Sequence, residues 1–108
     1  MAVLGTTSYE VDNLIVGEYD NDNRYPVESG NTVTRGQVMK LSSGKLSPCL
    51  TTETPSTIML EDVDASGADA YGSYMTRGTV LESEVNYNTG SADEFREALR
   101  SVQIITKG

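Results

Sequence analysis

The chain has 108 residues, with 16 aspartates and glutamates against 8 lysines and arginines, and a formal net charge of −8 at pH 7. This length predicts a single domain. The lysines and arginines are scattered along the sequence, which argues against nucleic acid or an anionic membrane as a partner. There is no histidine and only one cysteine, Cys49, so an internal disulfide is excluded and a zinc site is not expected. We expect Cys49 to be a buried apolar side chain rather than a reactive thiol.

The first third of the chain, to about Thr34, is polar and rich in turn-forming residues. Its apolar content is concentrated in residues 10–18, which is enough for one short strand. We expect residues 1–16 to form an extended N-terminal arm and residues 17–108 to form a single β-rich domain. The start of the chain lacks the features of a signal peptide, and no stretch is apolar enough to span a bilayer.

The middle of the chain has the alternating pattern of β-strands. Residues 37–41 alternate, a Ser-Ser-Gly-Lys turn signal follows, and Leu46 resumes the pattern, which predicts a hairpin. Residues 57–63 predict a core strand and residues 64–69 a loop. Residues 71–81 predict further extended structure with a turn or bulge at Gly78. Strands at this spacing, without helical periodicity between them, argue against a parallel βαβ architecture.

One helix is predicted, near the C-terminus. Ser91 and Glu94 have the spacing of a capping box, in which each side chain satisfies a free backbone amide at the start of a helix. Residues 103–106 predict a closing strand after this helix. The apolar residues of the helix recur at spacings of three and four, so they share one face that can pack on a sheet: Phe95, Ala98, Leu99 and Val102.

Two acidic patterns resemble functional sites but lack what the chemistry requires. Residues 62–67 imitate the start of a calcium-binding EF-hand loop, yet the twelfth position, which needs a bidentate glutamate, is Ser73. Glu82 and Glu84 would share a face if their segment were a strand, but a solvated surface explains them better than a catalytic pair. We therefore predict no catalytic residue, no metal ligand and no cofactor, and we expect that the protein is not an enzyme.

From Gly36 to its end, the chain resembles the lambda-type head decoration proteins of tailed bacteriophages. Residues 36–46 are similar to that family's apolar strand, serine-containing turn and Lys-Leu return. Residues 58–69 are similar to its apolar strand running into an acidic, glycine-containing loop. Residues 74–80 are similar to the following strand, with its basic residue and glycine, and residues 91–106 to the short helix and final strand. The first third of the chain has no such match.

The resemblance implies a mainly β fold: a small β-clip-like domain with one short C-terminal α-helix and an extended N-terminal arm. It also implies a structural protein of the virion, made in the host cytoplasm. Such a protein binds the major capsid protein on the outer surface of the expanded head as a homotrimer and stabilises the capsid. Neither the resemblance nor the composition points to nucleic acid, a membrane or a small-molecule substrate as a partner.

In that family, an N-terminal arm becomes extended on docking and pairs with strands of the capsid. In this chain, an equivalent arm would add a strand to an exposed capsid edge, with backbone hydrogen bonds supplying the affinity. A frayed terminus is the alternative interpretation of the same segment. The apolar residues that would contact the capsid are Val3, Leu4, Tyr9 and Val11.

Two other functions fit the composition. An acidic inhibitor or mimic of nucleic acid would occupy a basic site on another protein, but its acids should cluster, and here they are spread from Glu10 to Glu97. A phage tail or fibre domain would share the β-rich, glycine-rich and threonine-rich composition. The solution mass, together with binding to expanded capsids, would separate both from a decoration protein.

Overall fold

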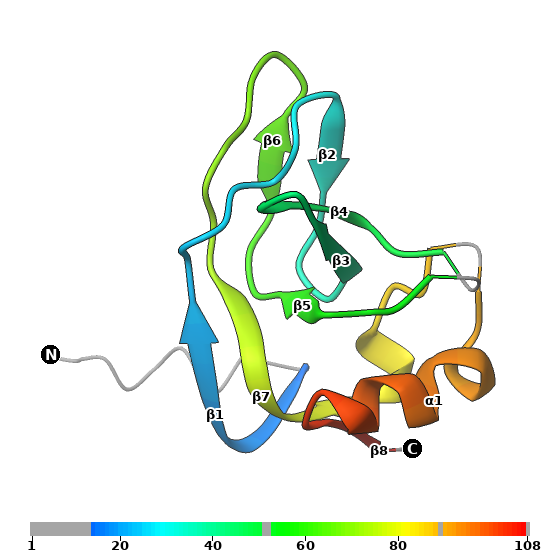
Figure 1. The fold of residues 1–108 in the computed structure, drawn as a ribbon. Coiled ribbons are helices and arrows are strands. Elements are labelled where there is room, and N and C mark those ends of the chain that lie inside the picture. The colour runs from blue at the N-terminus through cyan, green and yellow to red at the C-terminus, as the bar shows by residue number, and fades with distance from the viewer. Residues whose placement is uncertain (1–13, 51–52, 89, 108) are drawn as a thin grey trace, which may run out of the picture.

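The computed structural model describes residues 14–50, 53–88 and 90–107. As predicted, the fold is mainly β, with an α-helix near the C-terminus (Figure 1). In chain order, the elements are β1 (Ile15–Asp22), β2 (Asn31–Val33), β3 (Val38–Ser42), β4 (Lys45–Pro48), β5 (Thr57–Met59), β6 (Val63–Ala65), β7 (Tyr74–Leu81), the 3-10 helix η2 (Glu82–Glu84), α1 (Ala92–Ser101) and β8 (Ile104–Lys107).

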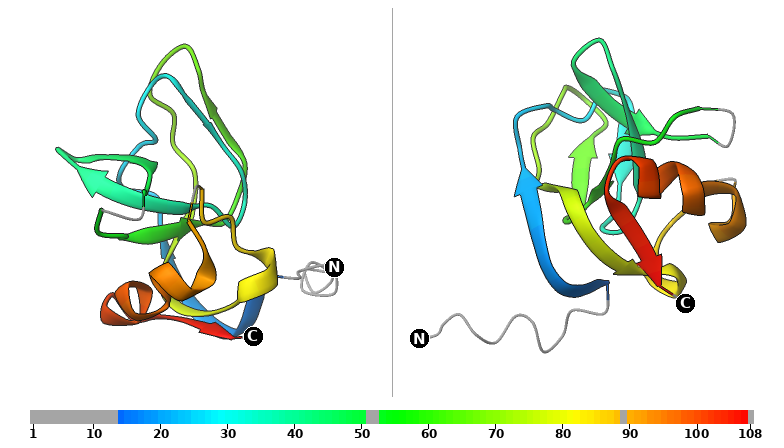
Figure 2. Two further views of the ribbon diagram at one scale, coloured as in Figure 1. Left: turned by 90° about the vertical axis from the view of Figure 1, so that its right-hand side faces the viewer. Right: turned by 60° about the horizontal axis from the view of Figure 1, so that its bottom comes forward.

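The strands form a six-stranded sheet and a separate two-stranded ribbon. The order in the large sheet is β1-β7-β5-β3-β4, with neighbours antiparallel, and β8 pairs with β7 in parallel. The ribbon pairs β2 with β6. Figures 1 and 2 show this ribbon at one end of the molecule and α1 with β8 at the other.

The centre of the large sheet is buried on both faces, which divides the core in two. Val38 and Ile58 belong to one apolar cluster, and their chain neighbours Met39 and Met59 belong to the other. The first cluster is covered by α1, and the second is covered by the β2–β6 ribbon. All three residues of β5 are accordingly buried, including the polar Thr57.

The predicted hairpin is confirmed as β3 and β4. Its register pairs Ser42 with Lys45, so the turn contains two residues, Ser43 and Gly44. Both have positive φ values, 53° and 77°, as a type I′ turn requires. A glycine at the second of these positions adopts the left-handed conformation without a steric penalty.

The strand predicted over residues 57–63 is wrong in extent. β5 ends at Met59, where the chain leaves the large sheet, and β6 begins at Val63 in the ribbon. β6 also includes Asp64 and Ala65, which were expected in a loop. Exposed Glu61 and Asp62 interrupt the apolar run between the two strands, but the local pattern does not indicate which sheet each strand joins.

The sheet does not have a parallel βαβ architecture, as expected, but it contains one such unit. β7, α1 and β8 form a strand, helix and parallel strand, with Gly78 opposite Ile104 and Leu81 opposite Lys107. The helix packs Phe95 and Leu99 into the core and returns the chain to the same end of the sheet, which a parallel pair requires. The remaining pairs of the large sheet are antiparallel.

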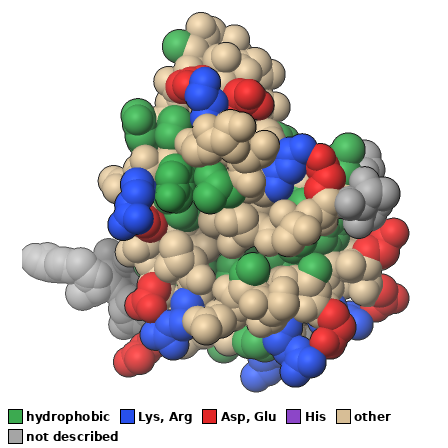
Figure 3. All heavy atoms as spheres, viewed as in Figure 1, with side chains coloured by type: hydrophobic (Ala, Val, Ile, Leu, Met, Phe, Trp, Pro, Cys, Tyr) green, Lys and Arg blue, Asp and Glu red, His purple; other side chains and the backbone are tan. Residues whose placement is uncertain are grey.

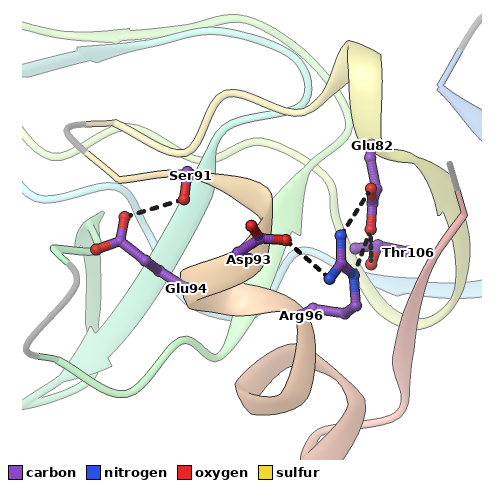
Figure 4. Close-up of polar contacts among 6 residues, drawn as sticks. All are labelled: Glu82, Ser91, Asp93, Glu94, Arg96 and Thr106. Carbon is purple, nitrogen blue, oxygen red and sulfur yellow. Dashed lines mark hydrogen bonds and ion pairs between the residues drawn. The ribbon is translucent and has the colours of Figure 1, made fainter.

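The predicted helix is confirmed, but its capping box does not form. Ser91 is the N-cap residue, yet its hydroxyl lies 3.2 Å from the Glu94 carboxylate and does not bond a backbone amide (Figure 4). In a capping box the serine oxygen would instead accept a hydrogen bond from a backbone amide, and the glutamate would accept one from the amide of the N-cap residue. Here the two side chains pair with each other, and the Glu94 amide donates to the Ser91 carbonyl at 3.1 Å.

Candidate functional site

Leu14 is the first residue that the structure describes, and it directly precedes β1. The side chain of Leu14 is 3% exposed, and its carbonyl accepts a hydrogen bond from the Leu81 amide at 2.8 Å. Residues 15 and 16, expected in the arm, lie in β1 opposite Val80 and Thr79. The predicted contact residues Val3, Leu4, Tyr9 and Val11 lie outside the described residues.

β1 forms one edge of the large sheet, and its exposed side is acidic. Among the described residues it pairs with β7 alone, and Glu18, Tyr19 and Asp20 are all exposed. Asp20 forms an ion pair with Arg77 of β7 at 2.9 Å. Charged side chains and bulges are the usual means by which an edge strand avoids uncontrolled pairing with other chains. This edge is therefore protected against self-association, while it directly continues the segment expected to contact a partner.

A bulge in β1 faces Gly78 of β7. The register runs from Val16 opposite Thr79 to Asp20 opposite Arg77, so β1 has extra residues at this point. The prediction of a bulge at Gly78 therefore holds for the pair of strands, although the inserted residues belong to β1. A β-carbon on Gly78 would lie 2.7 Å from the β-carbon of Tyr19. Glycine is needed here because the bulged strand passes directly over it.

The side chain of Glu82 joins three elements at the opposite end of the molecule from the ribbon. It accepts hydrogen bonds from Arg96 Nε at 2.8 Å, from Arg96 Nη2 at 3.1 Å and from the Thr106 hydroxyl at 2.8 Å (Figure 4). Arg96 also bonds Asp93 at 2.9 Å. The bonds from Arg96 and Thr106 lower the pKa of Glu82 below its ordinary value. This carboxylate therefore stays ionised and links η2 to α1 and β8.

The acidic pair and the acidic turn considered as sites do not form the arrangements that those sites require. Glu82 and Glu84 lie in η2 and not on a strand, so they do not share a strand face. In the turn, Asp62 accepts the Arg35 amide at 2.8 Å, and Asp64 accepts the Ser66 amide at 3.0 Å. Within the part of the chain that the structure describes, no three acidic or cysteine side chains gather as a metal ion would require.

Cys49 lies in the core, as expected. Its side chain is fully buried, and burial raises the pKa of the thiol to about 11, with the nearby charge of Glu53 adding to the effect. A thiol is nucleophilic only as the thiolate, so Cys49 is almost entirely in its unreactive form at neutral pH. Cys49 is therefore a structural residue of the core.

Asn88 is a structural residue that the sequence pattern did not reveal. It has a positive φ of 61°, and its side-chain amide donates to the carbonyls of Val38 at 2.9 Å and Cys49 at 2.8 Å. Its oxygen accepts a hydrogen bond from Gln37 at 2.7 Å. This one side chain holds the loop before α1 against β3 and the segment after β4. The asparagine is a plausible left-handed residue from sequence, but its distant partners carry no local signal.

Several large apolar side chains are exposed, and some gather on one face. Val27 and Ala70 exchange backbone hydrogen bonds of 2.7 and 3.1 Å, which brings Pro26 and Tyr71 beside each other. Tyr71 is 67% exposed, and Tyr25 is partly buried against the second core cluster. Figure 3 shows hydrophobic side chains collected on this face below the end of the molecule formed by the ribbon.

The chain matches no known protein-family model and no curated protein. No helix among the described residues is long and apolar enough to cross a membrane.

Proposed function

We propose that the protein is a phage capsid decoration protein, which binds the outer surface of the expanded head as a homotrimer and stabilises it. The observation that carries this proposal is the order of elements from Gly36 onward. The four segments similar to the decoration family are the β3–β4 hairpin, the β5–β6 segment, β7 and the α1–β8 unit. They are consecutive, and each contributes to the core. The trimer, the shell partner and the virion location rest on the resemblance.

The arrangement at β1 supports docking through the N-terminal residues. Residues 1–13 directly precede Leu14 in the sequence, and the strand that follows Leu14 is a sheet edge. A segment that pairs with a capsid strand would be covalently continuous with β1. It would therefore connect the capsid directly to the six-stranded sheet. Val3, Leu4, Tyr9 and Val11 supply apolar side chains for such a contact.

A binding function without catalysis agrees with the chemistry of the described residues. The chain contains no histidine, and its one thiol is buried and protonated. The carboxylate with the most elaborate surroundings, Glu82, is held ionised by Arg96 and Thr106. A general acid or base needs a pKa near the working pH, and Glu82 is shifted away from it.

The acidic mimic is the weaker alternative. A mimic of nucleic acid presents carboxylates that are free to meet a basic partner. In this structure, seven carboxylates already form ion pairs with lysine or arginine: Asp20, Asp22, Glu53, Asp69, Glu82, Asp93 and Glu97. No observation favours a tail or fibre domain over a decoration protein.

The test is cosedimentation with expanded capsid shells that lack a decoration protein, run beside a measurement of solution mass. We expect the full-length protein to bind these shells, and a variant without residues 1–11 to lose most of its binding while it stays trimeric. A second variant, in which Val3, Leu4, Tyr9 and Val11 are all changed to serine, keeps the length of the arm and isolates its apolar contacts.

The outcomes separate the two parts of the proposal. Unchanged binding by a trimeric deletion variant would exclude the arm as the contact but leave the decoration function standing. A full-length protein that is monomeric and does not bind expanded shells would overturn the function itself. Binding to a basic nucleic-acid enzyme instead would favour the acidic mimic.

A further inference from the structure

We draw no further inference here: the strongest candidate, the partly exposed surface patch of Tyr25, Pro26 and Tyr71 between the end of β1 and the β2–β6 ribbon, carries nothing because no feature of the described residues shows what covers it.

Discussion

Single side chains hold together parts of this chain that are far apart in sequence, and Asn88 is the clearest example. Its amide group satisfies two backbone carbonyls, of Val38 and Cys49, in a region where the side chains of both residues are fully buried. A buried carbonyl that loses its donor costs the free energy of its desolvation. The hydrogen bonds of the Asn88 side chain therefore stabilise the loop before α1, β3 and the segment after β4.

We expect Asn88→Ala to lower the free energy of unfolding by about 1–3 kcal/mol, measured by urea denaturation. Asn88→Gly removes the same hydrogen bonds but adopts the positive φ without strain, so it isolates the loss of the side-chain contacts. Asn23→Ala, at an exposed position, is the matched control. A change within about 0.5 kcal/mol for Asn88→Ala, similar to the control, would show that these bonds do not stabilise the fold.

The pairing of β1 with β7 depends on the missing side chain at Gly78. Its φ of 154° and the 2.7 Å approach of the Tyr19 β-carbon leave no room for a substituent. We expect Gly78→Ala to destabilise the protein by about 1–3 kcal/mol, measured by thermal or urea unfolding. Gly67→Ala, where nothing lies within 4 Å, is the control and should be nearly neutral. Equal stabilities for Gly78→Ala and Gly67→Ala would contradict the close approach of β1 to Gly78.

The attachment of α1 to η2 and β8 through Glu82 predicts a pH-dependent contribution to stability. The folded-state pKa of Glu82 is lower than its ordinary value of 4.5. The stabilisation is therefore present above the unfolded-state pKa and is lost as the pH falls through the folded-state value. We expect Glu82→Gln to be less stable than the unmodified protein at neutral pH, with the difference shrinking below pH 4.5.

Unfolding curves at several pH values, with Glu84→Gln as the matched control, would measure this effect. Glu84 lies in the same 3-10 helix and is exposed, so its change removes one charge without removing the Arg96 contact. A pH-independent difference for Glu82→Gln, or an equal effect from Glu84→Gln, would show that the ion pair does not stabilise the α1–β8 unit.

The elements that sequence predicts well are those whose signals are local. The β3–β4 hairpin follows from its serine and glycine turn, and α1 follows from the spacing of Phe95 and Leu99. The elements predicted poorly depend on distant partners. The division of residues 57–65 between two sheets, and the parallel pairing of β8 with β7, are set by contacts with segments far along the chain. A local pattern of apolar residues is the same for either outcome.

The same distinction applies to the candidate site. The apolar residues of the arm could be listed from the sequence, but their surroundings depend on a partner. Tyr19, packed over Gly78, and the Glu82–Arg96 pair, which spans 14 residues, became apparent only from the register of the strands and the packing of α1. Composition did indicate correctly that Cys49 would be buried, because a lone cysteine without a histidine neighbour is most often a small apolar core residue.

At the scale of the whole molecule, the fold is a mainly β body with its apolar residues divided between two faces of one sheet. An acidic edge strand lies beside the segment expected to bind the shell. With a net charge of −8, molecules of the protein repel each other at low ionic strength, which opposes their non-specific aggregation. A cementing protein gains its stability and its function from the same contact, because anything that binds the folded state stabilises it.

The most direct test of the central claim is the temperature at which expanded shells break open, measured with and without saturating protein. The decoration function predicts that shells carrying the protein resist higher temperature, and that the variant without residues 1–11 gives little protection. Shells that break open at the same temperature with bound protein as without it would contradict the proposed cementing function.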